Sequence, residues 1–223
     1  TAYGNNLYID NVIVVPAAPP TVSSNIYLTG NAYALFKSTN MGTSWDSLTF
    51  LAPGAQQPWT STYYSTDMVP GNNDDLITVG AFGLINKKQG STNTVLTSVI
   101  KPGTINDVWA ASSTGTVIAV GNPTSTGGSF DQILRSTNGG STWAVVPYST
   151  TSRTVFYDIE MVDNNTGWVV GSLSAVYKTT NGGANWDSVT TITDMAAGLT
   201  LRKVVFPTAS TGYIFSASIV APD

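Results

Sequence analysis

A ten-residue segment that ends in tryptophan occurs three times in this chain and constrains its fold more than any other feature. The first copy runs from Phe36 to Trp45, the second from Leu134 to Trp143, and the third from Tyr177 to Trp186. In each copy an apolar residue and a basic residue precede hydroxyl residues, an asparagine, a glycine and the tryptophan. Repetition of this kind predicts a fold built from repeated supersecondary units.

The spacing of the copies predicts the size of the repeated unit. Trp143 and Trp186 are 43 residues apart, whereas 98 residues, about two periods, separate Trp45 from Trp143. A degenerate copy from Leu84 to Thr94 fills this longer gap, since it repeats the apolar and basic residues but lacks the tryptophan. A period of this length is typical of one four-stranded propeller blade.

Short β-branched and aromatic runs, separated by Gly, Asn and Pro, predict strands throughout the chain. We therefore predict an all-β fold, a β-propeller of four-stranded antiparallel blades. About four and a half blades fit in the chain, which either closes as five blades or is part of a larger ring. The predicted boundaries are 1–15 for an incoming strand or the end of a preceding module, 16–50, 51–98, 99–147 and 148–190 for four blades, and 191–223 for a partial fifth blade.

Closure as five blades has a specific structural consequence. The N-terminal strand would then have to complete the last blade, because a ring leaves no strand edge unpaired. We expect in that case that Val12 to Val15 lie beside Val204 to Phe206.

The tryptophan segment has the composition of a hairpin turn. Asparagine side chains bond to nearby backbone groups, and glycine adopts positive φ at low steric cost. The tryptophan ring is expected to pack between neighbouring sheets, with its indole N–H able to find a partner. The residues with this structural role are Asn40, Gly42, Trp45, Asn138, Gly140, Trp143, Asn181, Gly183 and Trp186.

These turns resemble the Asp-box of BNR-like repeat propellers, which include sialidases, sortilin-like receptors, xyloglucan-cleaving glycosidases and photosystem II assembly factors. The copy that ends at Trp186, preceded by Gly167 to Gly171, is most similar to the assembly-factor and sortilin-like propellers. All three copies have asparagine where the family has aspartate. An amide keeps the turn hydrogen bond without the charge, so we predict a structural role and no metal site. The resemblance indicates the fold more sharply than the function.

Composition excludes several classes of function. The chain has no histidine and no cysteine, which excludes Ser-His-Asp and Cys-His nucleophiles as well as His- or Cys-ligated zinc. Its nine Lys and Arg are scattered and its formal net charge is −4, so we expect no nucleic acid partner. No apolar run is long enough for a membrane span. We expect no cofactor.

Carboxylates on the inner strands are the remaining catalytic candidates. Asp67, Asp107 and Asp158 align at one repeat position, and Glu160 shares a strand face with Asp158. A glycoside hydrolase needs two carboxylates that face one cleft. The alternative is a repeat position that ends or solvates the inner strand, and we favour this structural role.

The leading hypothesis is a secreted or cell-surface binding module without enzymatic activity, part of a larger adhesin or extracellular assembly. Its expected partners are protein or glycan, with self-association or neighbouring domains of the same polypeptide as alternatives. Low charge and abundant Ser, Thr and Asn favour export, with a periplasmic location as the alternative, and the composition resembles that of type IX secretion cargo. The alternative functions are a glycoside hydrolase of the Asp-box type and an assembly-factor-like scaffold. Ser47 and Ser188, each after aspartate and before an aliphatic residue, match a bacterial O-glycosylation sequon.

Overall fold

The computed structural model describes residues 7–8, 25–31, 34–48, 62–69, 75–90, 92–96, 103–111, 113–122, 133–148, 154–192 and 195–217. Within these ranges the chain is all-β, apart from a single 3₁₀ turn, η1 (Ala81–Gly83). The described helical turn is far too short to cross a membrane. The fold class predicted from the repeat is confirmed, because consecutive segments of the chain form antiparallel four-stranded sheets.

Four sheets have four strands each, and the strands pair in the order in which they occur in the chain. The first sheet contains β1 (Leu7–Tyr8), β2 (Ile26–Gly30), β3 (Leu35–Ser38) and β4 (Asp46–Ser47). The second contains β5 (Tyr63–Met68), β6 (Leu76–Gly80), β7 (Ile85–Gln89) and β8 (Thr92–Val95). The third contains β9 (Ile105–Ala110), β10 (Val117–Gly121), β11 (Ile133–Ser136) and β12 (Ala144–Val145). The fourth contains β13 (Phe156–Met161), β14 (Gly167–Gly171), β15 (Val176–Thr179) and β16 (Asp187–Ser188).

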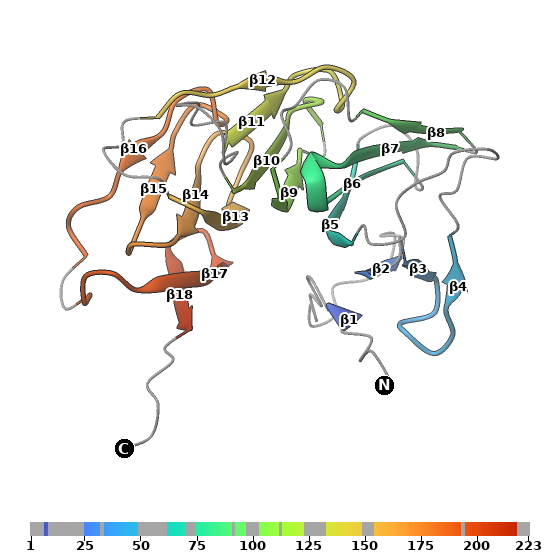
Figure 1. Cartoon of the computed structure of the whole chain (residues 1–223), viewed down its shortest axis with the longest axis horizontal. Helices are drawn as coiled ribbons and strands as arrows, with labels where there is room; N and C mark the ends of the chain where they lie inside the picture. Colours follow the sequence, from blue (N-terminus) through green and yellow to red (C-terminus); the bar gives the residue numbers. More distant parts are fainter. Residues whose placement is uncertain are drawn as a thin grey trace.

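A fifth sheet has two described strands, β17 (Thr200–Thr208) and β18 (Thr211–Ala217). Figure 1 shows the five sheets following one another along an arc, with the first and fifth sheets at its two ends. The fourth strands, β4, β8, β12 and β16, lie at the outer rim of the arc, and β5, β9, β13 and β17 lie toward its inside. These inner strands contact one another from blade to blade, which is the arrangement of a propeller.

Strand β1 belongs to the first sheet, where Leu7 pairs with Gly30 and Tyr8 with Thr29. The first sheet therefore uses residues before position 16, which the sequence analysis assigned to an incoming strand or a preceding module. These two residues pair within the first sheet rather than with β18. Val12 to Val15, on which the closure expectation rests, lie outside the described residues.

The hydrophobic core lies between neighbouring sheets rather than in one central cluster. Strands β6 and β10 are buried at every residue, because each is covered on both faces by adjacent blades. One cluster joins the second and third sheets, and another, which includes the fully buried Phe156, joins the third and fourth. Burial on both faces explains why these strands read as continuous apolar runs rather than as alternating patterns.

The degenerate repeat in the second blade forms a shorter hairpin than the three clear copies. Gln89 pairs directly with Thr92, and Gly90 has a φ of 55° at the turn. The blade keeps its third and fourth strands, although it has lost the asparagine and tryptophan of the box. The repeat position therefore predicted the strands correctly where the turn chemistry had changed.

Candidate functional site

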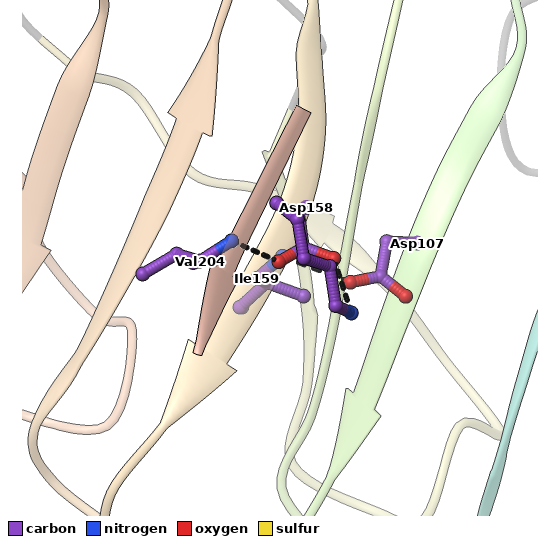
Figure 2. A network of polar contacts seen from close by, with 5 residues as sticks. Asp107, Asp158, Ile159 and Val204 are labelled. Carbon is purple, nitrogen blue, oxygen red and sulfur yellow. Dashed lines mark hydrogen bonds and ion pairs between the residues drawn. The ribbon is translucent and has the colours of Figure 1, made fainter. Parts of the chain in front are cut away.

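The inner-strand aspartates connect neighbouring blades. Asp107 in β9 accepts a hydrogen bond from the backbone N–H of Ile159 in β13, with 2.8 Å between Oδ2 and N. Asp158 in β13 accepts one from the backbone N–H of Val204 in β17, also at 2.8 Å. Figure 2 shows both carboxylates directed at the backbone of the next inner strand. The two residues are 4% and 3% exposed, so each carboxylate serves as a buried acceptor for the neighbouring blade.

Asp67 makes the same kind of contact at a different position. Its Oδ2 accepts the backbone N–H of Ala110 at 2.7 Å. Asp67 pairs with Ile77, however, whereas Asp107 and Asp158 pair with Val120 and Val170.

The register shows that the prediction of one shared repeat position was wrong for Asp67. Gly80, Gly121 and Gly171 are equivalent, because each packs against the backbone just before or at the start of its inner strand. Counted from these glycines, Ser65 is the equivalent of Asp107, and Asp67 lies one full pleat period further along β5. A shift of two residues preserves the strand face, so Asp67 still reaches the next blade.

At the strand position that holds Asp107 in the third sheet and Asp158 in the fourth, the fifth sheet has a lysine. Lys203 pairs with Phe215, which makes it the counterpart of Asp158 in its own blade. Its Nζ lies 2.8 Å from Oδ1 of Asp158, forming a part-buried ion pair. Both oxygens of Asp158 therefore bond to the fifth sheet.

Glu160 is half-buried and pairs with Trp168 on the neighbouring strand. It lies on the same face of β13 as Asp158, as expected from strand alternation. Since Asp158 bonds to Val204 and Lys203, the strand does not present two accessible carboxylates to one cleft.

Basic residues of the third strands also reach across blade boundaries. Lys87 Nζ lies 2.6 Å from Ser141 Oγ, and Arg135 Nε donates to the carbonyl of Gly182 at 2.7 Å. Burial lowers the pKa of the Lys87 amine, and the nearby Asp75 carboxylate partly opposes this effect. The basic position of the repeat thus contributes to blade packing.

The box asparagines organise their turns in all three copies. Their Oδ1 atoms accept the backbone N–H of Ser44, Thr142 and Asn185, each at 2.9 Å. In the first two copies the amide Nδ2 also donates to the hydroxyl of Ser44 or Thr142 at 2.8 Å. The amide therefore keeps the turn hydrogen bond that the sequence analysis expected it to make in place of aspartate.

The boxes of the third and fourth blades pack on the second strand of the preceding blade. A Cβ at Gly140 would lie 2.4 Å from Ile77 Cδ1, and one at Gly183 would lie 2.5 Å from Ile118 Cδ1. A Cβ at Gly42 would meet only the ring of Trp45. The described residues place no preceding blade against the first box.

The box tryptophans differ in burial for this reason. Trp186 is 4% exposed and packs in the core between the third and fourth sheets, whereas Trp45 is 37% exposed. Trp143 is half-buried, and its Nε1 donates to the carbonyl of Gly140 at 3.0 Å. The Nε1 of Trp186 has no hydrogen-bond partner among the described residues. The partner expected for the indole N–H is therefore found for Trp143 and not for Trp186.

An open groove of about 290 Å³ lies where the outer strands of the third blade meet the box of the fourth. Its lining residues are Arg135, Thr137, Thr142, Trp143, Ala144, Val145, Val146, Pro147 and Ala184. No carboxylate lines this groove, so it has no acid–base pair for hydrolysis. Ser47 and Ser188, the predicted glycosylation sites, are exposed on the outer strands β4 and β16.

Sequence reasoning missed two turns that join the second and third strands of a blade. Phe82 in the second blade and Leu173 in the fourth have left-handed φ values of 57° and 59°. Their side chains are 62% and 55% exposed. The signal available in the sequence was a short gap between two predicted strands with a bulky apolar residue in its middle.

A protein-family model described as photosynthesis system II assembly factor YCF48 matches residues 134–219. Among solved structures, YCF48 from Cyanidioschyzon merolae is similar over 86% of this chain and 61% of its own, with 15% identity and a TM-score of 0.59. The GH74 enzyme of Niastella koreensis is similar over 81% of this chain and 30% of its own, with 20% identity and a TM-score of 0.59. No curated protein sequence matches.

The chain therefore spans less than two thirds of each of these two structures. At such identities the likeness concerns the fold, which an assembly factor and an enzyme share. Together with the three boxes and the blade architecture, these matches show a β-propeller fold, and residues 134–219 are similar to the YCF48 family.

Proposed function

We propose that this chain is a propeller scaffold that binds a protein partner and carries out no catalysis. The observation that carries the proposal is the use of the inner-strand carboxylates. Asp107 and Asp158 are buried and accept backbone N–H groups of the next blade. A general acid or base must instead reach the substrate proton that it transfers.

The match of residues 134–219 to the YCF48 family model supports a scaffold role in particular. This segment contains the two best preserved boxes and the fourth blade with its complete set of strands. The family is described as an assembly factor, and this description names no reaction. We propose an assembly role of the same kind for this chain.

Export to the cell surface or the extracellular space, as part of a larger adhesin or assembly, is a further part of the proposal. The composition supports it, since only 10% of the residues are charged. Ser47 and Ser188 are both exposed, as an O-glycosylation site must be. Fractionation of the source cells and intact mass of the natural polypeptide test this part, and a cytosolic, unmodified protein would contradict it.

Two assays on the purified 223-residue chain test the scaffold function against the hydrolase alternative. The first measures binding to an array of synthetic peptides, and the second measures new reducing ends released from xyloglucan and other soluble polysaccharides. We expect peptide binding and no release. Reducing ends produced by the wild type and lost in Glu160→Gln would overturn the proposal in favour of a hydrolase.

A further inference from the structure

The boundaries between the second, third and fourth blades are built from the same two faces. One face carries a residue of a second strand, Ile77 in β6 or Ile118 in β10, that pairs with the basic residue of the third strand. The other face carries the box of the following blade, whose glycine, Gly140 or Gly183, lies on that isoleucine. A blade in this chain therefore has two different faces, a second-strand face and a box face, and the two fit each other.

In the described part of the chain, no blade lies against the box face of the first sheet. Met41 holds the position of Gly139, where an added Cβ would lie 3.2 Å from Val69 of the preceding blade. Met41 is 72% exposed and Trp45 is 37% exposed, whereas Trp186 in the fourth blade is buried. The first box is thus exposed at the residues through which the later boxes contact a preceding blade.

Two strand residues extend this box face behind the turn. Leu28 pairs with Phe36 in the first sheet, as Val169 pairs with Tyr177 in the fourth. Val169 and Tyr177 are buried in the core that joins the third and fourth sheets, whereas Leu28 and Phe36 are only half-buried. The exposed face therefore includes the box and the two strands that lead to it.

The box face of the first sheet is apolar with neutral hydroxyl groups. Its described residues include Leu28, Phe36, Met41, Trp45 and Ser47. The charged residues of the same strands, Lys37 and Asp46, are neighbours across β3 and β4 on the opposite face of the sheet.

At the other end of the arc, β18 corresponds to the second strands of the earlier blades. Phe215 pairs with Lys203, the counterpart of Asp158. Since Asp158 pairs with Val170, Phe215 is the counterpart of Val170 in β14. The register of β17 and β18 thus identifies which residues of β18 form the second-strand face.

Tyr213 lies on the same face of β18 as Phe215, two residues earlier. Its counterpart in the fourth sheet is Trp168, which pairs with the basic residue Lys178 just as Ile118 pairs with Arg135. Tyr213 therefore holds the position that receives a box glycine at the two earlier boundaries.

The second-strand face of β18 is exposed. Tyr213 and Phe215 are each 54% exposed, whereas Ile118 and Val170 are fully buried in their own blades. Within the described ranges β18 pairs only with β17, and no box lies against it. The fifth sheet therefore presents the kind of surface on which the third and fourth boxes pack.

The basic residues of β17 are engaged with the fourth blade. The Lys203 amine forms an ion pair with Asp158, and the Arg202 guanidinium carbon lies 4.0 Å from the centroid of the Tyr157 ring. The aromatic side chains of β18 are thus the main feature of the exposed face. Two apolar faces associate through the loss of exposed apolar surface, so salt does not weaken their association.

We infer that the chain associates head to tail, with the box face of the first sheet in one copy docked on the second-strand face of the fifth sheet in another. The contact repeats the blade-to-blade contact found twice within the chain, with Gly42 over Tyr213 as Gly183 lies over Ile118. A contact between two different faces generates a ring where the rotation closes and a filament where it does not. This self-association goes beyond the proposed binding of a protein partner and does not depend on it.

Two other arrangements compete for the same surfaces. The first and fifth sheets of one copy could close on each other, but they stand apart at the two ends of the arc (Figure 1). Two copies of β18 could pair edge to edge, because its outer edge has no partner among the described strands. Edge-to-edge pairing leaves the first box exposed, whereas the head-to-tail contact covers both apolar faces at once.

Sedimentation velocity of the 223-residue chain over a range of concentrations measures the association. We expect species larger than one copy that increase with concentration and persist in high salt. Met41→Asp blocks the box face and Phe215→Glu blocks the second-strand face, since each places a charge in an apolar contact. Aspartate tolerates the left-handed φ of Met41, so the turn is not strained. Each variant is expected to raise the apparent Kd at least about tenfold.

Matched controls place the same charged residues at exposed apolar positions outside the two faces. Leu173→Asp changes a residue that is 55% exposed and has left-handed φ, and Val145→Glu changes one that is 47% exposed on the outer strand β12. We expect both controls to associate as the wild type does. Circular dichroism verifies that each variant keeps the fold.

A mixture of the two single variants distinguishes head-to-tail from edge-to-edge association. Met41→Asp keeps an intact second-strand face, and Phe215→Glu keeps an intact box face. Together they should form a complex of one copy of each and nothing larger, although each alone is monomeric. The double variant has both faces blocked and should remain monomeric.

Each contrary result would overturn the inference. A wild-type chain that stays monomeric over the whole concentration range would show that the two faces do not join separate copies. Association that Met41→Asp retains and Phe215→Glu loses would identify edge-to-edge pairing of β18. Folded single variants that do not associate when mixed would show that the two residues do not belong to one contact, and equal loss in the controls would show that the faces are not specific. Peptide binding by the monomeric double variant tests the proposed function separately, so either proposal can fail alone.

Discussion

Asp107 accepts the backbone N–H of Ile159 across the boundary between the third and fourth blades, with 2.8 Å between Oδ2 and N. The same relationship recurs between Asp158 and Val204 at the next boundary. Each of these buried carboxylates accepts a hydrogen bond from a strand of the next blade. Strand pairing within one sheet provides no such connection between blades. Loss of the carboxylate leaves a buried N–H without a partner.

Asp107→Ala is therefore expected to lower the free energy of unfolding by about 1–3 kcal/mol. Asp107→Asn should cost less, because the amide oxygen can still accept the Ile159 N–H. Urea denaturation followed by tryptophan fluorescence measures the difference. Asp187→Ala is the control, since Asp187 is exposed on the outer strand of the fourth blade. Equal stability of Asp107→Ala and the control would contradict the role assigned to Asp107.

Alanine substitutions at two box glycines, Gly42 and Gly183, are expected to destabilise the fold to different extents. Gly183→Ala introduces a Cβ at a φ of 75° and within 2.5 Å of Ile118 Cδ1, whereas Gly42→Ala has only the left-handed φ to accommodate. We expect about 1–2 kcal/mol of destabilisation for Gly42→Ala. Overpacking should add about 1–3 kcal/mol for Gly183→Ala. Thermal unfolding of both variants measures this order, and a larger effect at Gly42 would show that blade packing is assigned incorrectly.

Asp163 predicts a dependence of stability on acid pH. The backbone N–H groups of Asn165 and Thr166 donate to its carboxylate, both at 2.7 Å, and lower its pKa from 3.8. A depressed folded-state pKa gives stability that is present above the unfolded-state pKa and is lost as the pH falls through the folded-state value. Below about pH 4, Tm is expected to fall less steeply with decreasing pH in Asp163→Asn than in the wild type. A curve that keeps its slope there would exclude the contribution.

The turn that joins β6 and β7 predicts that replacing an exposed apolar residue raises the stability of the fold. Its two central residues, Phe82 and Gly83, both have positive φ, as in a type I′ hairpin turn. Phe82→Asn gives the turn its preferred Asn-Gly sequence and removes a bulky side chain from left-handed φ. We expect an increase of about 1 kcal/mol in the free energy of unfolding. Urea denaturation of the single variant checks this value, and clear destabilisation would mean that Phe82 packs against its own chain.

Several elements of the fold followed from the sequence because their chemistry is local. The asparagine and glycine residues of the box specify a tight turn wherever they occur, and the apolar strands around them follow the repeat. In the second blade the repeat still predicts the strands, although the box of this blade has lost the tryptophan. The equivalence of Asp67 with Asp107 and Asp158 failed because an offset of two residues leaves the strand face and the local pattern unchanged.

The sequence by itself determined the blade as the repeated unit, the turn chemistry of the boxes and the exclusion of histidine- and cysteine-based chemistry. Tertiary structure decided what the inner-strand carboxylates do, because the amide that Asp107 or Asp158 accepts belongs to a strand about 50 residues later. It also decided which tryptophans are buried, since Trp186 lies against a preceding blade and Trp45 does not. Both depend on the packing of one blade against the next, which residue spacing along the chain does not specify.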